Sequence, residues 1–154
     1  FNYCKNLKSV WWKGKVNRIG VQCFGATGLE QFCVNAKNID SCAFIGCEDL
    51  KEIHIRSGVE NLNMTAFAML TGIETICLEG IDPDVMEADW VNLQNSTVTI
   101  MVPEDTTDEQ LQLVTQKFAS AYIIVNKSQV QKDSCQLSDD PMPDIDGLVG
   151  AYGI

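Results

Sequence analysis

The stretch CAFIGCEDLKEIHI, from Cys42 to Ile55, decides the fold because its main features recur along the chain. Its aromatic residue has counterparts at comparable positions before and after it. The five aromatic positions are Phe1, Phe24, Phe44, Phe67 and Trp90, separated by 23, 20, 23 and 23 residues. Self-similarity with a period of this size indicates a repeat architecture. The sequence therefore predicts a repeat protein.

The residues that follow each aromatic position recur as well. In the first four units an aliphatic residue comes first and is followed by two apolar residues that are two positions apart. The aliphatic residues are Leu7, Leu29, Leu50 and Ile73, and the apolar pairs are Val10/Trp12, Phe32/Val34, Ile53/Ile55 and Ile76/Leu78. Alternation with a period of two is typical of a short β-strand with one buried side. Because one unit cannot bury this side alone, we expect the units to stack into a parallel sheet.

A further aliphatic residue stands five positions before the later aromatic ones, and the series is Ile19, Ile39, Leu62 and Val85. We expect this series and the aromatic residues to fill the side of the core that lies opposite the sheet. The seven cysteines contain no C-x-x-C pair, which favours buried thiols over a metal or disulfide framework. By their repeat positions, Cys4, Cys23 and Cys47 are expected to be buried and Cys42 to lie in a turn. The cysteines whose roles the spacing leaves open are Cys33, Cys77 and Cys135.

The pattern A-F-x-x-C-x-x-L-x-x-I-x-I around Ala43–Ile55 resembles the BspA-like (Treponema pallidum type) leucine-rich repeats of bacterial surface proteins. The segments FNYCKNLKSVWW and TAFAMLTGIETICL are similar to the same unit, so the resemblance covers about two thirds of the chain. It implies a curved solenoid, a secreted or cell-surface setting, and an adhesive or protein-binding role.

The pattern changes after Val102. Thr106-x-x-Glu109 is a helix start signal, and Leu111, Val114 and Phe118 recur at helical spacing, which predicts a helix over about residues 107–119. The apolar run AYIIVN then predicts a strand. Strand, helix and strand together are expected to cap the last edge of the repeat sheet.

The sequence thus predicts an α/β repeat solenoid. We expect a curved leucine-rich-repeat stack with a short parallel sheet on its concave face and a strand-helix-strand cap. Residues 1–102 form about four to five repeats that begin in mid-repeat, residues 103–126 the capping helix and strand, and residues 127–154 an acidic tail or linker.

Side chains that alternate with the buried pairs are expected to line the concave face. This face is the default binding surface of a solenoid, and its candidate partner-binding residues are Trp11, Gln31, Glu52, His54, Arg56 and Thr75. The same alternation places Thr97 beside Thr75, Thr99 beside Cys77, and Met101 beside Glu79 on the next strand. Trp11 is the candidate aromatic anchor of the surface.

Chemistry other than binding finds little support. The chain has one histidine and neither a Gly-rich phosphate loop nor a Ser/His/Asp arrangement, so we expect no enzyme, no catalytic residue and no cofactor. The column Cys33, His54, Cys77 could hold a soft metal, but a flat face offers no fourth ligand, and no metal site is predicted. The net charge of −10 disfavours nucleic acid and anionic membranes. No apolar run is long enough to span a bilayer.

The expected function is therefore protein binding or adhesion, outside the cell or at the cell surface. The expected partner is a protein, such as one of the host extracellular matrix or a cell surface. One alternative is a carbohydrate-binding module with Trp11 as stacking platform, and another is a structural spacer in a larger surface protein. An open N-terminal repeat edge also predicts self-association.

Overall fold

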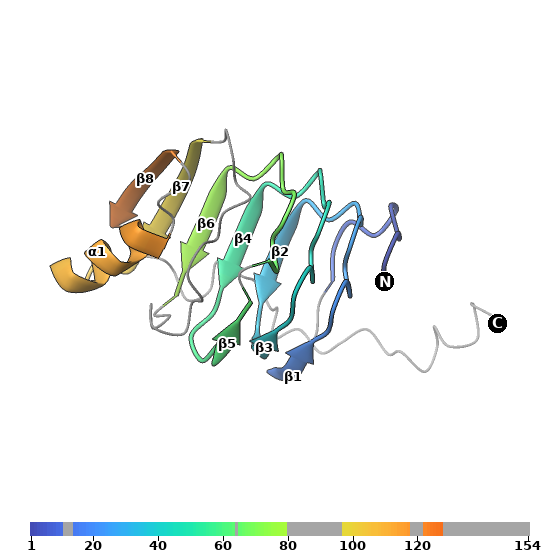
Figure 1. Cartoon of the computed structure of the whole chain (residues 1–154), viewed down its shortest axis with the longest axis horizontal. Coiled ribbons are helices and arrows are strands. Elements are labelled where there is room, and N and C mark those ends of the chain that lie inside the picture. The colour runs from blue at the N-terminus through green and yellow to red at the C-terminus, as the bar shows by residue number, and fades with distance from the viewer. Residues whose placement is uncertain (11–13, 64, 80–96, 118–121, 128–154) are drawn as a thin grey trace.

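The computed structural model describes residues 1–10, 14–63, 65–79, 97–117 and 122–127 of the 154-residue chain, with no side chains described beyond residue 116 (Figure 1). Successive repeats lie side by side along the longest dimension of the molecule, so that equivalent strands from neighbouring repeats pair with one another. The chain is a repeat solenoid, as predicted. Its curvature and the limits of its parts at residues 102 and 126 stay predictions.

Two parallel sheets run along this stack. The larger sheet has the order β2-β4-β6-β7-β8, and its strands are Gln31–Val34, Glu52–Ile55, Thr75–Leu78, Thr97–Val102 and Tyr122–Lys127. The smaller sheet has the order β1-β3-β5, and its strands are Val16–Ile19, Ala36–Ile39 and Asn61–Leu62. The alternation did not predict the smaller sheet, because the apolar residues of β1 and β3, Val16/Ile19 and Ala36/Ile39, stand three positions apart and not two.

The core lies between the two sheets and follows the repeat pattern. The inward pairs of β2, β4 and β6 are all buried, as predicted, and are Phe32/Val34, Ile53/Ile55 and Ile76/Leu78. The aliphatic series is buried through Ile19, Ile39 and Leu62, which belong to the smaller sheet. Trp12, Val85 and Trp90 lie outside the described residues.

An aromatic stack runs through the turns between the sheets. The rings of Phe24 and Phe44 stack with centroids 5.4 Å apart, and Phe67 stacks on Phe44 at 5.2 Å. Phe1 stacks on Phe24 at 5.5 Å but is 66% exposed. The 20-residue and 23-residue units therefore keep their aromatic residues in one column.

A helix connects the last two strands of the larger sheet. Helix α1 spans Asp108–Lys117 and lies beside β7 and β8 (Figure 1). Its start signal is one residue later than predicted: the Thr107 hydroxyl accepts from the Gln110 amide at 3.2 Å, and the Gln110 side-chain oxygen accepts from the Thr107 amide at 3.0 Å. The sequence Thr106–Gln110 satisfies the capping-box pattern in both registers. Phe118 lies outside the described residues, and the capping role of this segment stays a prediction.

The cysteines differ from one another more than their repeat positions predicted. Cys47 is fully buried, and its thiol donates to the carbonyl oxygen of Phe24 at 3.0 Å. Cys42 lies in a turn, as predicted, with a positive φ of 56°. Cys23 is only partly buried and Cys4 is exposed, so these two predictions were wrong. The turn that carries Cys4 has a described repeat on one side only, and nothing described covers its other side.

Candidate functional site: the outward face of the larger sheet

The outward face of the larger sheet carries two rows of side chains in register across adjacent strands. Here, the outward face means these two rows, which point away from the core. The first row is Gln31, Glu52, Thr75 and Thr99. The second row is Cys33, His54, Cys77 and Met101.

The register between β6 and β7 corrects the sequence prediction. Thr75 pairs with Thr99, and Cys77 pairs with Met101, whereas the predicted columns placed Thr97 and Thr99 at these positions. A shift of two residues leaves every inward side chain inward and every outward one outward. The hydrophobic pattern is therefore the same in both registers and could not distinguish them.

The predicted partner-binding residues differ in how far they reach solvent. Gln31 is exposed, and Glu52 and Thr75 are half-buried. His54 points outward but is only 7% exposed, and its role as a contact residue stays a prediction. Trp11 lies outside the described residues.

The burial of His54 follows from its neighbours on the sheet. Glu52 is two residues earlier on β4, and its Oε1 atom lies 2.6 Å from His54 Nε2. Cys77, directly opposite His54 on β6, is itself only 3% exposed. The donor atoms of these three side chains all lie within 4.8 Å of one another. Sequence alternation placed His54 and Cys77 together but missed that Glu52 completes the group.

The Cys77 thiol is held in its neutral form. Burial, together with the nearby carboxylates of Glu52 and Glu79, raises the pKa of Cys77 to about 11. On its other side, Cys77 Sγ lies 3.7 Å from Met101 Sδ. In this apolar and negatively charged setting the thiolate is disfavoured.

Arg56 follows β4 and is the remaining predicted contact residue. Its Nε atom lies 3.4 Å from Oε2 of Glu79, which follows β6, and the Glu79 side chain is only 6% exposed. An ion pair between neighbouring repeats thus holds the Arg56 side chain, which leaves it 24% exposed. Arg56 serves the packing of the repeats in addition to any contact with a partner.

Cys33 has a covalent role that its spacing left open. It is disulfide-bonded, while the other described cysteines are free. The remaining cysteine of the sequence, Cys135, lies outside the described residues.

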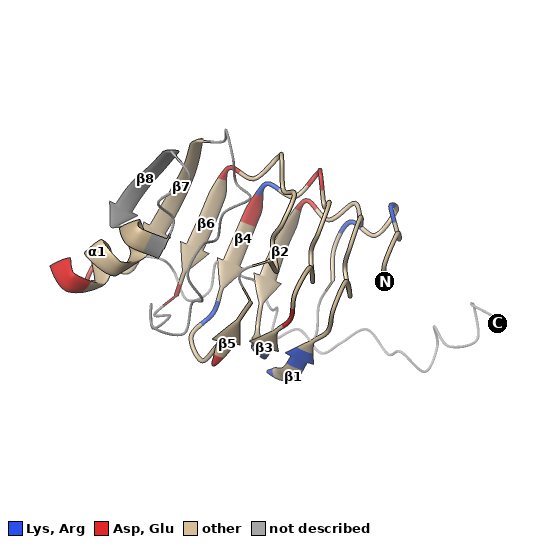
Figure 2. Ribbon diagram, in the orientation of Figure 1, with Lys and Arg blue, Asp and Glu red and all other residues tan. Residues whose placement is uncertain are grey.

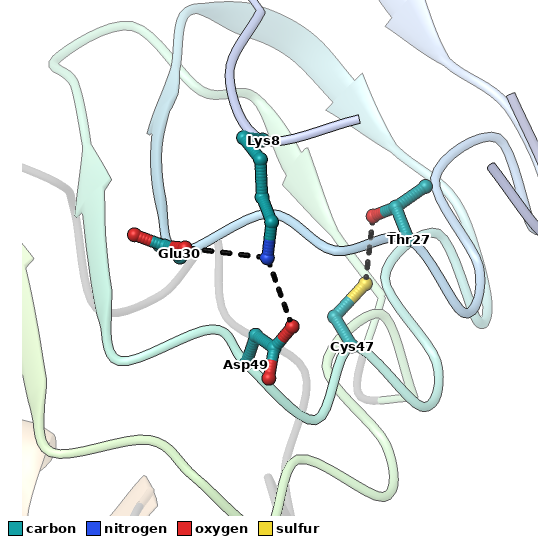
Figure 3. Close-up of polar contacts among 5 residues, drawn as sticks. All are labelled: Lys8, Thr27, Glu30, Cys47 and Asp49. Atoms are coloured by element: carbon teal, nitrogen blue, oxygen red, sulfur yellow. Dashed lines mark hydrogen bonds and ion pairs between the residues drawn. The ribbon is translucent and has the colours of Figure 1, made fainter. Parts of the chain in front are cut away.

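Charged side chains also link successive repeats at the start of the strands. Acidic residues lie at or just before the first residue of three adjacent strands, namely Glu30, Glu52 and Glu74 (Figure 2). Lys8 reaches Glu30 and Asp49, each at 3.2 Å, beside the contact between Thr27 and Cys47 (Figure 3). These carboxylates raise the pKa of the Lys8 ammonium.

A shallow hollow of about 150 Å³ lies next to this ion-pair cluster, between the turns that carry Thr27 and Asp49. Pockets for small molecules generally enclose about 300 to 1,000 Å³. The hollow is thus too small for a typical substrate or cofactor.

Comparison with known proteins connects this repeat geometry to a family. A family model described as BspA type leucine rich repeat region matches six copies over residues 1–84, more than half of the chain. The chain belongs to this family. No curated protein and no solved structure matches it.

The family match bears on the class of function. Leucine-rich repeats of this type are generally non-enzymatic binding modules, commonly related to protein binding or adhesion, and the proteins that carry them are typically surface-associated. Among the described residues, no helix is both long and apolar enough to cross a membrane.

Proposed function

We propose that this chain is a non-enzymatic protein-binding or adhesion module that contacts its partner through the outward face of the larger sheet. The observation that carries the proposal is the register of Gln31, Glu52 and Thr75 on three adjacent parallel strands. These side chains reach solvent to different degrees, while the residues between them are buried in the core. The core therefore holds them in fixed positions, which reduces the conformational entropy that binding costs.

Charge narrows the class of partner. The chain carries a net charge of −10, and acidic residues mark the starts of β2, β4 and β6 (Figure 2). Such a surface repels nucleic acid and anionic lipid and favours a protein with a neutral or basic contact area. In keeping with the family, we propose a partner of the host extracellular matrix or a cell surface, and a location outside the cell.

Surface plasmon resonance against a panel of purified extracellular-matrix and cell-surface proteins tests the proposal. For each protein that binds, the variant Gln31→Arg/Thr75→Arg places two large cations in the first row and should weaken binding at least tenfold. The matched control is Asn17→Arg/Asn61→Arg, which makes the same change of charge at exposed positions of β1 and β5. Equal losses of affinity in both variants would show that net charge, and not the outward face, governs binding. Unchanged affinity in both variants would exclude the outward face as the contact surface.

A glycan array with the same preparations decides the carbohydrate alternative. Binding to glycans, abolished by Trp11→Ala, would replace the protein-binding proposal with a carbohydrate-binding one. A chain that binds neither panel fits the structural spacer.

Self-association through the N-terminal repeat stays a prediction. Sedimentation of the Phe1→Ser/Tyr3→Ser variant tests it, because both side chains are strongly exposed.

A further inference from the structure

The outward face brings together three side chains that bind transition metals well. His54 and Cys77 are paired on adjacent strands, and Glu52 lies two residues before His54, on the same face of β4. One donor atom from each lies within 4.8 Å of the others. We propose that Glu52, His54 and Cys77 form a zinc-binding site on the outward face, which goes beyond the proposed protein-binding role.

The geometry is close to that of a tetrahedral zinc centre. Zinc ligands at usual bond lengths, about 2.0 to 2.3 Å, place neighbouring donor atoms about 3.3 to 3.6 Å apart. Glu52 Oε1 and His54 Nε2 are 2.6 Å apart, so they must separate by about 1 Å or less to share an ion. The Glu52 side chain is 42% exposed and is free to make this movement. The backbones of His54 and Cys77 are fixed by the parallel ladder between β4 and β6.

The charges of the three ligands match a divalent cation. The Glu52 carboxylate and the Cys77 thiolate together carry two negative charges, so the bound centre is neutral. This matters because His54 and Cys77 are buried, and an uncompensated charge there would be costly. Binding forms a bond between Cys77 Sγ and zinc, and the thiol proton passes to water without a change of oxidation state.

The donor set selects among metals. Calcium and magnesium prefer oxygen ligands, whereas a mixture of imidazole, thiolate and carboxylate suits zinc. With three ligands from the chain, the fourth position is open to water on the side of the half-exposed Glu52. Met101 Sδ, 3.7 Å from Cys77 Sγ, is a ligand that copper(I) would prefer, so copper(I) is the competing ion.

Calorimetric titration of Zn²⁺ into the metal-stripped full chain tests the site, with Co²⁺ as a spectroscopic probe of thiolate ligation. We expect one zinc ion per chain and a thiolate-to-cobalt charge-transfer band. Glu52→Gln, His54→Gln and Cys77→Ser should each weaken zinc binding at least tenfold. Glu104→Gln and Cys42→Ser should change it less than twofold, because Glu104 is exposed and Cys42 lies in a turn away from the group.

Two further measurements keep the test decisive if a buried variant fails to fold. Circular dichroism identifies such a variant, and Glu52→Gln changes a half-exposed side chain while keeping its shape. In the unmutated chain, zinc should slow alkylation of Cys77 at least tenfold and leave Cys42 unaffected. Absence of zinc binding, or zinc binding unaffected by Glu52→Gln and without protection of Cys77, would overturn the proposal. Binding of copper(I) alone, lost in Met101→Leu, would overturn the assignment to zinc.

Discussion

On β4 and β6, the side chains that point into the core are all buried, whereas only some of those that point outward are, and for a different reason. The inward residues Ile53, Ile55, Ile76 and Leu78 are at most 1% exposed. On the outward face, His54 and Cys77 are buried as well, through contacts with polar neighbours on the same face. Inward burial follows from hydrophobic alternation, whereas outward burial depends on which side chains the register brings together.

The difference separates stability from function. Inward side chains stabilise the fold because their apolar surface is removed from water. Each contact between neighbouring repeats adds such a contribution to the stability of the stack. Outward side chains gain little free energy from contacts in half-exposed positions. The outward face can therefore differ between repeats without loss of the fold, while the inward face cannot.

Ile53→Ala should have the largest effect on stability. The side chain is fully buried between neighbouring repeats, so its truncation should lower the free energy of unfolding by about 2 to 5 kcal/mol. Urea denaturation followed by circular dichroism measures the change. Gln31→Ala on the outward face is the control, with an expected change within about 0.5 kcal/mol. Equal losses in the two variants would contradict the separation of the two faces.

The sequence was sufficient for the parts of the fold that depend on apolar spacing. The repeat, the inward pairs and the aromatic stack all follow from residues that recur at fixed distances, such as Phe24, Phe44 and Phe67. The smaller sheet was missed because the apolar residues of β1 and β3 stand three positions apart and so show no period of two. The register of β7 was missed because a two-residue shift preserves the alternation.

The site was less predictable than the fold. Alternation correctly assigned Gln31, Glu52 and Thr75 to one row across three strands. It could not foresee that the Glu52 carboxylate turns toward His54, because a side-chain torsion decides this contact. The disulfide of Cys33 was equally hidden, since cysteine spacing in a repeat reflects packing as well as pairing.

Gly72→Ala should have the next largest effect and extends the comparison to the turns. A Cβ atom at Gly72 would overlap the backbone carbonyl oxygen of Glu48 in the preceding repeat. The repeats would have to separate locally, at a cost of about 1 to 3 kcal/mol. Gly20→Ala is the matched control, because nothing lies within 4 Å of a Cβ at that position. Thermal unfolding measures both, and an unchanged midpoint for Gly72→Ala would show that the turns are not closely packed.

The alkylation of Cys77 tests the outward burial without changing stability. Because the pKa of Cys77 is raised to about 11, only a small fraction is thiolate at pH 8, and this fraction grows about tenfold per pH unit up to the pKa. In the metal-free chain, the rate of labelling by iodoacetamide should therefore keep rising to about pH 11. Peptide mass spectrometry resolves Cys77 from the exposed Cys4, which serves as control. Labelling of Cys77 as fast as Cys4 at pH 8 would show that the outward face is open.

We expect the smallest effect on stability from breaking an exposed ion pair, in contrast to the buried residues of the inward face. Lys37 Nζ lies 2.9 Å from Glu60 Oε1, and this contact lowers the pKa of Glu60. Because the pKa of Glu60 is lower in the folded state, its ionised form stabilises the fold at pH values above the ordinary pKa of 4.5. This contribution is lost as the pH falls through the lowered pKa. Glu60→Gln should therefore shift the unfolding midpoint slightly at pH 7 and by less at pH 3. A shift of the same size at both pH values would mean that shape, and not charge, is what Glu60 contributes.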